Sequence, residues 1–255
     1  MLGDLKQKLQ GRQKVFATTI THAGWSGIIQ RMKNDTIDIL VFDLEHGLFT
    51  SERAEEMIRM CNVVGIPAIV RVADAEYAFI SSALDMGADG ILAPRVETVD
   101  QARRVVDSVR FPPVGKKGCG GFSLLRGGDA LSSVKSFNEA RIIFLQIESE
   151  RGIANLGDMI DAAEGQLGGI IVGPTDLSIS MSIPLQYGHP RLVDAIGEVL
   201  RVCQREQISC GLFCGDKEDI SYWRRKGMNI IWAGTDVGFL LSAYNDLCGF
   251  VQGLA

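Results

Sequence analysis

Short runs of β-branched and aliphatic residues recur eight times in this 255-residue chain, and they restrict its fold more than any other feature. The runs occupy residues 15–20, 37–45, 67–72, 89–96, 141–149, 168–174, 209–215 and 228–236. A strand that is apolar along nearly its whole length is buried on both faces, which happens when helices cover both sides of a parallel sheet. The chain is therefore predicted to build a parallel sheet between layers of helices.

A segment with helical periodicity follows each run. In residues 51–65, Ser51 is a candidate N-cap, and an apolar stripe from Ala54 to Cys61 ends before Gly65. Similar helices are predicted at 24–32, 76–87, 98–109, 153–165, 190–207, 217–227 and 237–252. Eight such units in a chain of this length are typical of a (β/α)8 barrel, whereas a doubly wound sheet more often has about five to seven strands. We predict an α/β fold, a (β/α)8 TIM barrel that occupies residues 1–255 as a single domain.

Composition and charge exclude several classes of protein. Hydrophobic residues make up 46% of the chain and charged residues 22%, which argues against general disorder. The formal net charge of −5 provides no basic surface for a nucleic-acid partner. The polar N-terminus lacks an apolar signal core and no run is long enough to span a membrane, so we expect a cytoplasmic protein. The six cysteines lack the spacing of zinc or redox motifs and are expected to be buried free thiols.

Polar residues gather where several predicted strands end. They are Asp43, Glu45 and His46 after the second run, Arg71 in the third, Gln146 and Glu148 in the fifth, and Asp176 after the sixth. The carboxyl ends of the strands carry the active site in barrels of this kind. We therefore expect these side chains to converge on one rim of the barrel.

Glu148 and Asp176 are the candidate metal ligands. Two carboxylates with a neutral amide nearby form an oxygen-rich site that suits a hard cation such as Mg²⁺ or Mn²⁺. Such a site leaves positions open for water and a chelating 2-oxo acid. The alternative reading is that both residues are helix caps or rim salt bridges.

The stretch FDLEHG, residues 42–47, has two readings. In one, Asp43 bonds its own backbone in a polar turn at the strand end. In the other, a carboxylate orients His46, which then works as a base near neutral pH. Asp43 is our choice for that carboxylate, and Glu45 competes for the same role. Arg71 either pairs with an acid at the rim or binds a substrate carboxylate or enolate oxygen.

Residues 110–140 form a long Gly-, Pro- and Ser-rich connection, which is predicted to be a flexible active-site loop. A nucleotide site is disfavoured because GKKGCGG lacks Walker spacing. His189 precedes a proline-initiated helix and is expected to cap it.

Five motifs in this order resemble the HpcH/HpaI family of metal-dependent class II pyruvate aldolases. They are FDLEHG, PAIVRV, GADGILAPRVETVDQAR, QIES and GPTDLS, and the likeness runs from about residue 14 to residue 245. The resemblance implies a TIM barrel of the phosphoenolpyruvate/pyruvate-binding type with an extra C-terminal helix. It also implies reversible cleavage of a 4-hydroxy-2-oxo acid to pyruvate and an aldehyde through a pyruvate enolate stabilised by a divalent cation, Mg²⁺, Mn²⁺ or Co²⁺.

The resemblance also implies roles for individual residues. Glu148 and Asp176 bind the metal, His46 with Asp43 transfers the proton, and Arg71 faces the enolate. Pyruvate is bound by Arg71, Gln146, Gly173 and Thr175. Family members form hexamers, as trimers of dimers, by exchanging C-terminal helices, although the apolar stretch DVGFLLSAYNDLCGFVQGLA could equally cover its own barrel. The family commonly has an Arg-Gly step where this chain has Lys116-Lys117-Gly118, which leaves the aldehyde undefined.

Two other functions fit the same residues. One is a related carbon–carbon lyase that acts on an acyl-CoA ester or decarboxylates oxaloacetate, and the other is a non-catalytic barrel that binds a keto acid. A Schiff-base aldolase is disfavoured because no lysine lies inside a strand near the rim.

Overall fold

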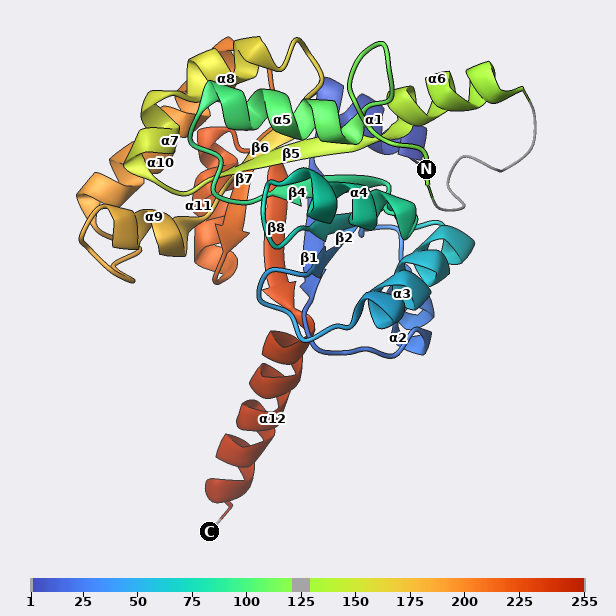
Figure 1. Ribbon diagram of the computed structural model, residues 1–255. Helices are drawn as coiled ribbons and strands as arrows, with labels where there is room; N and C mark the ends of the chain where they lie inside the picture. The colour runs from blue at the N-terminus through green and yellow to red at the C-terminus, as the bar shows by residue number, and fades with distance from the viewer. Residues whose placement is uncertain (1, 121–128, 255) are drawn as a thin grey trace.

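Eight parallel strands close into a barrel in the order in which they occur in the chain (Figure 1). The computed structural model describes residues 2–120 and 129–254. The strands are β1 (Val15–Ile20), β2 (Ile39–Asp43), β3 (Ala68–Arg71), β4 (Gly90–Ala93), β5 (Ile142–Ile147), β6 (Gly169–Val172), β7 (Cys210–Cys214) and β8 (Ile230–Thr235). Each of the eight apolar runs supplies one strand, and the predicted (β/α)8 barrel is confirmed.

Helices surround the barrel. They are α1 (Leu2–Gln10), α2 (Gly27–Met32), α3 (Ser51–Val64), α4 (Tyr77–Asp85), α5 (Val99–Val109), α6 (Ala130–Ala140), α7 (Glu150–Ala154), α8 (Leu156–Ala162), α9 (Pro174–Ser180), α10 (Pro190–Arg205), α11 (Lys217–Lys226) and α12 (Asp236–Gln252). Within the described residues, no helix combines the length and the apolar character needed to cross a membrane.

Several helices begin, end or divide at residues other than those predicted. The cap of α3 is Thr50, whose hydroxyl accepts the backbone N–H of Arg53, so Ser51 is not the cap. The single helix predicted at 153–165 is two helices, α7 and α8, which meet at Asn155. His189 caps α10 as predicted, because its Nδ1 accepts the backbone N–H of Arg191 at 3.2 Å.

The long connection at 110–140 is more ordered than its composition indicates. Residues 130–140 form α6, with Asp129 as the N-cap, so the prediction of a flexible loop is wrong for this part. Residues 121–128 lie outside the described part of the chain. The ammonium group of Lys117 is fully buried, 2.8 Å from Asp85, and it lies over the ring of Phe111.

Cysteine placement follows the prediction in part. Cys61, Cys203, Cys210 and Cys214 are free and buried, whereas Cys119 is exposed and Cys248 is half-buried.

The barrel interior is filled by large apolar side chains, including Ile39, Val41, Ile69, Phe144 and Trp232. Leu5 and Leu9 of α1 belong to the same cluster and close the amino-terminal end of the barrel. Alternate residues of each strand point inward. The interior is therefore apolar from its amino-terminal end to its middle, and the residues that continue the inward rows lie at the carboxyl rim.

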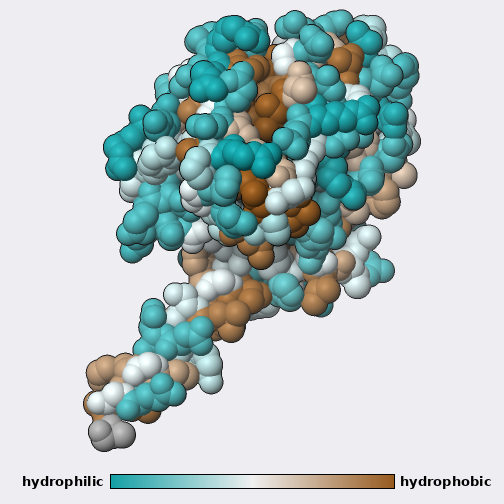
Figure 2. All heavy atoms as spheres, turned by 90° about the vertical axis from the view of Figure 1, so that its left-hand side faces the viewer, coloured by the Kyte–Doolittle hydropathy of each residue, from teal (hydrophilic) through white to brown (hydrophobic). Residues whose placement is uncertain are grey.

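Helix α12 projects away from the barrel beyond its first turn (Figure 1). Asp236 holds that first turn against the end of β1 by accepting the backbone N–H groups of Thr21 and His22, each at 2.9 Å. None of the residues of α12 is buried, and its large apolar side chains are exposed at Phe239, Leu240, Leu241, Tyr244, Leu247, Phe250 and Val251. Figure 2 shows brown side chains along this projecting helix. The helix does not cover its own barrel.

Candidate active site

On β2, β3 and β5, the alternate side chains that point into the barrel continue as polar side chains at the carboxyl end of the strand. Asp43 continues the row of Ile39 and Val41, and Arg71 continues the row of Ile69. Gln146 and Glu148 continue the row of Ile142 and Phe144 on β5. The strand period of two thus brings these polar side chains together above the apolar interior. The convergence on one rim that the sequence predicts is what the structure shows.

Asp43 and Arg71 form an ion pair between neighbouring strands. They are partners in the register of β2 and β3, and Arg71 Nε donates to Asp43 Oδ1 at 2.9 Å while Nη2 donates to Oδ2. Asp43 also accepts the backbone N–H groups of Glu45 and His46, at 3.0 and 3.1 Å. Burial alone would raise the pKa of Asp43, but the bonds and charge of Arg71 bring it below its ordinary range.

His46 lies beside Glu45 rather than beside the carboxylate of Asp43. The imidazole is 66% exposed, and its Nε2 is 3.8 Å from Glu45 Oε2. Glu45 is also 3.4 Å from Arg71 Nη1. Burial raises the pKa of Glu45, although the charges of Arg71 and His46 oppose the shift. The expected side-chain pair of Asp43 with His46 is therefore replaced here by a Glu45–His46 pair, because the lone pairs of Asp43 are used by Arg71 and the turn backbone.

The backbone of neighbouring residues packs closely against Gly47, which explains why this turn ends in glycine. A Cβ at this position would lie 3.1 Å from the carbonyl oxygen of Thr21 and would overlap the carbonyl of Asp43. Two predictions for FDLEHG are therefore correct: Asp43 bonds its own backbone in a polar turn, and the stretch lies on the rim of the barrel.

Glu148 is the most deeply buried free carboxylate of the rim. It is 6% exposed, its Oε1 accepts the backbone N–H of Arg95 at 2.8 Å, and its Oε2 accepts the amide of Gln146. Burial raises the pKa of Glu148 to about 7, and the negative charge of Asp176 adds to the rise, while the bond from Gln146 opposes it. The other amide atom of Gln146, Oε1, is buried and has no hydrogen-bond partner among the described residues.

These donors fit a hard divalent cation. Asp176 lies in the first turn of α9, is exposed to solvent, and is close enough to Glu148 to raise its pKa. Two carboxylates and an unpartnered amide oxygen form an oxygen set of the kind that Mg²⁺ or Mn²⁺ prefers. Within residues 2–120 and 129–254, no cluster of three or more His, Cys, Asp or Glu side chains has the arrangement of metal ligands. A cation here would therefore need water or substrate to complete its coordination.

Gly173 provides the space beside these donors. A Cβ at this position would lie 2.9 Å from Gln146 Nε2 and 3.0 Å from Glu148 Cβ, and closer still to Glu148 Oε2. Thr175 follows on α9, and its hydroxyl is 3.1 Å from that of Tyr187.

Arg95 is a rim residue that sequence reasoning missed. The apolar run at 89–96 predicts that it lies inside a strand, but β4 ends at Ala93, and Arg95 has a positive φ of 53°. In this conformation its N–H faces Glu148, and its guanidinium Nε is 3.6 Å from Glu45 Oε1. A non-glycine residue at positive φ costs free energy, which the bond to the buried carboxylate offsets. The available signal was a charged residue directly after a short apolar strand.

The Gly173→Ala variant is expected to lose stability. The added methyl group would push Glu148 and Gln146 from their positions, at a cost of about 1–3 kcal/mol for overpacking. Urea unfolding measures the free energy of unfolding. Gly188→Ala is the matched control, because no described residue lies within 4 Å of a Cβ at that position. Equal behaviour of the two variants would contradict the packing argument.

The raised pKa of Glu148 makes the stability of the metal-free protein depend on pH. The carboxyl titrates near 4.5 in the unfolded chain and near 7 in the folded protein. Folding keeps this carboxyl group neutral, and the resulting stability is fully present below pH 4.5 and is lost as the pH rises through 7. We expect the free energy of unfolding to fall by on the order of 3 kcal/mol across this window. Urea unfolding in chelator should show this component in the wild type and not in Glu148→Gln.

Comparison with known proteins identifies the family. The sequence model of the HpcH/HpaI aldolase/citrate lyase family matches residues 26–243. The 2-keto-3-deoxy-L-rhamnonate aldolase of Escherichia coli O17:K52:H18 is 28% identical over 201 residues, which cover 78% of this chain and 74% of that protein.

Two solved structures share the fold. An HpcH/HpaI aldolase from Desulfitobacterium hafniense DCB-2 has a TM-score of 0.90 at 23% identity, covering 97% of this chain and 96% of that one. An HpcH/HpaI aldolase/citrate lyase family protein from Burkholderia cenocepacia J2315 has a TM-score of 0.88 at 26% identity, covering 98% and 99%. The chain therefore belongs to the HpcH/HpaI aldolase/citrate lyase family, a family of carbon–carbon lyases.

Proposed function

We propose that this protein is a divalent-metal-dependent aldolase that reversibly cleaves a 4-hydroxy-2-oxo acid into pyruvate and an aldehyde. One observation carries the proposal: the buried carboxylate of Glu148 lies beside an unpartnered amide oxygen of Gln146, on the rim that also carries Arg71 and His46. The aldolase name of the 28% identical Escherichia coli protein supports the same reaction class.

Glu148 and Asp176 would hold the cation, with Mg²⁺, Mn²⁺ and Co²⁺ as the candidates. When bound, such a cation supplies Lewis-acid stabilisation of negative charge on the oxygens of a 2-oxo acid. The burial of Glu148 serves this purpose, because a carboxylate that is poorly solvated gains more from a cation than an exposed one does.

Arg71 has the geometry to stabilise a developing oxyanion. Asp43 takes two of its N–H donors and fixes the plane of the guanidinium, which leaves its remaining donors near the site. A guanidinium that is already held in place stabilises the transition state more than a mobile one does, because it does not have to reorganise during the reaction. Gln146, Gly173 and Thr175 complete the proposed pyruvate pocket, the last two through their backbone.

His46 would move the proton of the C4 hydroxyl, and we assign its orientation to Glu45. The 3.8 Å contact between Glu45 and the imidazole supports this choice over Asp43. Asp43 is instead a positioning residue for Arg71.

Substitution of the two acids separates their roles. Glu45→Gln is expected to lower kcat by about 10- to 100-fold, because the imidazole of His46 loses the carboxylate that orients it. Asp43→Asn should lower kcat through Arg71 instead, so it should add little to the loss in an Arg71→Lys background. Unchanged kcat in Glu45→Gln, together with a full additional loss from Asp43→Asn in the Arg71→Lys background, would restore Asp43 as the orienting acid.

Metal removal and replacement test the proposed reaction. The protein is stripped with a chelator, Mg²⁺, Mn²⁺ or Co²⁺ is returned, and pyruvate release is followed from a panel of 4-hydroxy-2-oxo acids. We expect no release after chelation and recovery with at least one cation. Release that survives full chelation would refute the metal dependence. Turnover only of oxaloacetate or an acyl-CoA ester would establish a different lyase, and binding of pyruvate without any turnover would establish a non-catalytic barrel.

The exposed apolar side chains of α12 support assembly with further copies of this chain. We propose that α12 packs on a neighbouring barrel in a homo-oligomer, and the family resemblance favours a hexamer. Light scattering after size-exclusion chromatography measures the mass. Leu247→Asp is expected to dissociate the oligomer, whereas Leu131→Asp, at an even more exposed leucine on α6, should not. A wild-type monomer would refute this assembly.

A further inference from the structure

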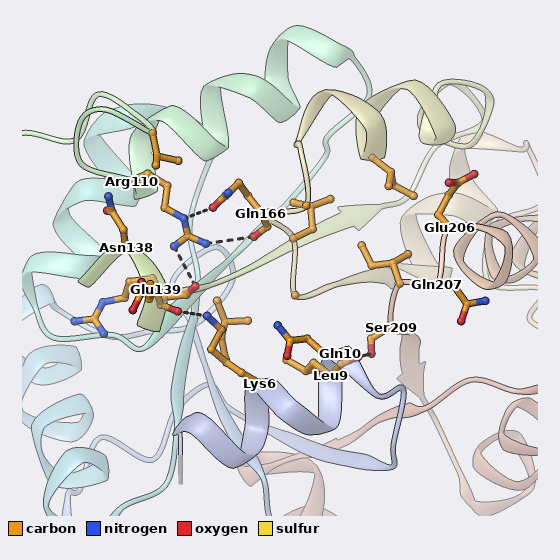
Figure 3. Close-up of a pocket in the computed structure, with 18 residues that line it drawn as sticks. Lys6, Leu9, Gln10, Arg110, Asn138, Glu139, Gln166, Glu206, Gln207 and Ser209 are labelled. Carbon is orange, nitrogen blue, oxygen red and sulfur yellow. Dashed lines mark hydrogen bonds between the residues drawn. The ribbon is translucent and has the colours of Figure 1, made fainter. Parts of the chain in front are cut away.

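A cavity of about 500 Å³ lies at the amino-terminal end of the barrel, opposite the catalytic rim. It is bounded by α1, by the segments that follow α5 and α6, and by the residues just before β6 and β7 (Figure 3). Strand β5 begins at Ile142 in the wall of this cavity and leads to Gln146 and Glu148 at the other end. At about 3.3 Å per residue, the two sites are separated by roughly 20 Å.

Three cationic side chains from separate segments line this cavity. They are Lys6 of α1, Arg110 at the end of α5, and Arg141 directly before β5. Figure 3 shows Lys6 and Gln10 pointing from α1 into the cavity, toward Arg110 and Gln166. The cations are close enough to interact. Burial and the charge of Arg141 lower the pKa of Arg110 to about 10. Burial and the charge of Arg110 lower the pKa of Lys6, while the charge of Glu139 opposes this shift.

Arg110 is a buried cation whose bonds all go to neutral oxygens. Its side chain is almost inaccessible, with 3% of the residue exposed. It donates to Gln166 Oε1 at 2.8 Å, to the carbonyl of Arg141 at 3.0 Å and to the carbonyl of Gln166 at 3.3 Å. A guanidinium has five N–H donors, so two are left over. Among the described residues, no carboxylate lies within 4.0 Å of it.

The acids that line the cavity already have partners of their own. Glu139 is 3.9 Å from Lys135, and Glu206 is 2.6 Å from Arg205. Lys6 donates to the backbone carbonyl of Glu139 rather than to its carboxylate. A buried charge without a counter-ion is unfavourable, and the free energy is recovered when an anion binds beside it. Glu139 acts on Lys6 through its charge, so the buried cation of the cavity that has no carboxylate within 4.0 Å among the described residues is Arg110.

We propose that this cavity binds the oxyanion group, carboxylate or phosphate, of a small polar metabolite. The oxyanion lies between Arg110 and Lys6, where the spare guanidinium donors and the ammonium group can reach it. The rest of the ligand extends along Gln10 and Gln207 toward the far end of the cavity. This is a second ligand site, independent of the catalytic rim.

Thermal unfolding of the full-length, chelator-treated protein tests the proposal. The probes are inorganic phosphate and gluconate, each compared with sodium chloride at equal ionic strength. At about 100 times its dissociation constant, a ligand that binds only the folded protein raises Tm by about 5–10 °C in a chain of this size. A rise with phosphate alone, with gluconate alone or with both identifies the preferred oxyanion. No rise with either probe would overturn the proposal.

Four variants locate the binding. Arg110→Gln is expected to abolish the Tm rise, and Lys6→Gln, whose partly exposed side chain is less important for folding, should weaken the affinity about tenfold. Lys217→Gln is the matched surface control, and Arg95→Gln tests binding at the catalytic rim; both should keep the full rise. A rise that is unchanged in Lys6→Gln, or lost in Arg95→Gln, would place the anion elsewhere and refute the site.

Discussion

Replacement of Glu148 by glutamine is expected to lower the rate of pyruvate release by about three orders of magnitude. The substitution keeps the size of the side chain and its bond from the N–H of Arg95, but it removes the charge that would hold the cation. Loss of about 4 kcal/mol of transition-state stabilisation corresponds to roughly a thousandfold in rate. Steady-state kinetics at saturating Mg²⁺ or Mn²⁺ measures the effect, and calorimetric titration of the metal should show a matching loss of affinity.

Glu150→Gln is the matched control for this experiment. Glu150 is two residues further along the chain, but it is exposed on α7 and lies 3.8 Å from Arg191. Its replacement should leave turnover and metal affinity within about twofold of the wild type, as is usual for a surface ion pair. If Glu148→Gln retained wild-type turnover, Glu148 would not be a metal ligand and the proposed mechanism would be wrong.

Substitution of Arg71 by lysine is expected to reduce kcat by about 100- to 1000-fold, the range seen when one preorganised oxyanion donor is removed. Lysine keeps the positive charge but cannot make the two parallel bonds by which Asp43 fixes the guanidinium. The buried carboxylate of Asp43 would also be left with one charged partner atom in place of two, at a stability cost of about 1–3 kcal/mol.

Arg104→Lys provides the comparison for Arg71→Lys. Arg104 forms an exposed ion pair with Glu76 on the outside of the barrel, so its conversion to lysine should change neither kcat nor stability measurably. Steady-state kinetics measures kcat and urea unfolding measures the free energy of unfolding of both variants. If the Arg71→Lys enzyme had the kcat of the wild type and only a raised KM, Arg71 would bind substrate without additional stabilisation of the transition state.

Most of the fold could be predicted because each strand and most helices show in the pattern of apolar residues of one short segment of sequence. Each of the eight apolar runs contains one strand. The first strand coincides with its run, and the other strands are shorter than their runs by two to four residues. The expected convergence of Asp43, Arg71, Gln146 and Glu148 on one rim could be predicted as well, because the carboxyl ends of the parallel strands of a barrel lie at the same end.

Other elements could not be predicted because their signals are not local. The helix α1 precedes the first apolar run and has a polar sequence, and α6 lies in a connection whose Gly, Pro and Ser content favours a loop. The pairing of His46 with Glu45 arises from a turn after β2, where strand alternation no longer applies. The position of Arg95 depends on a positive φ that no residue other than glycine signals from sequence alone.

The sequence by itself determined the parallel barrel and the rim that carries the polar side chains, because the strands show as local apolar runs and polar residues follow where the runs end. The family was indicated separately, by the resemblance of five short motifs. Only the tertiary structure decided which carboxylate meets His46 and that α12 leaves its own barrel. It also decided that, among the described residues, the Gln146 oxygen has no hydrogen-bond partner and Arg110 is buried beside a cavity without a carboxylate within 4.0 Å. These features depend on distances between segments that are far apart in the chain, and electrostatic free energies are set by such distances and by burial.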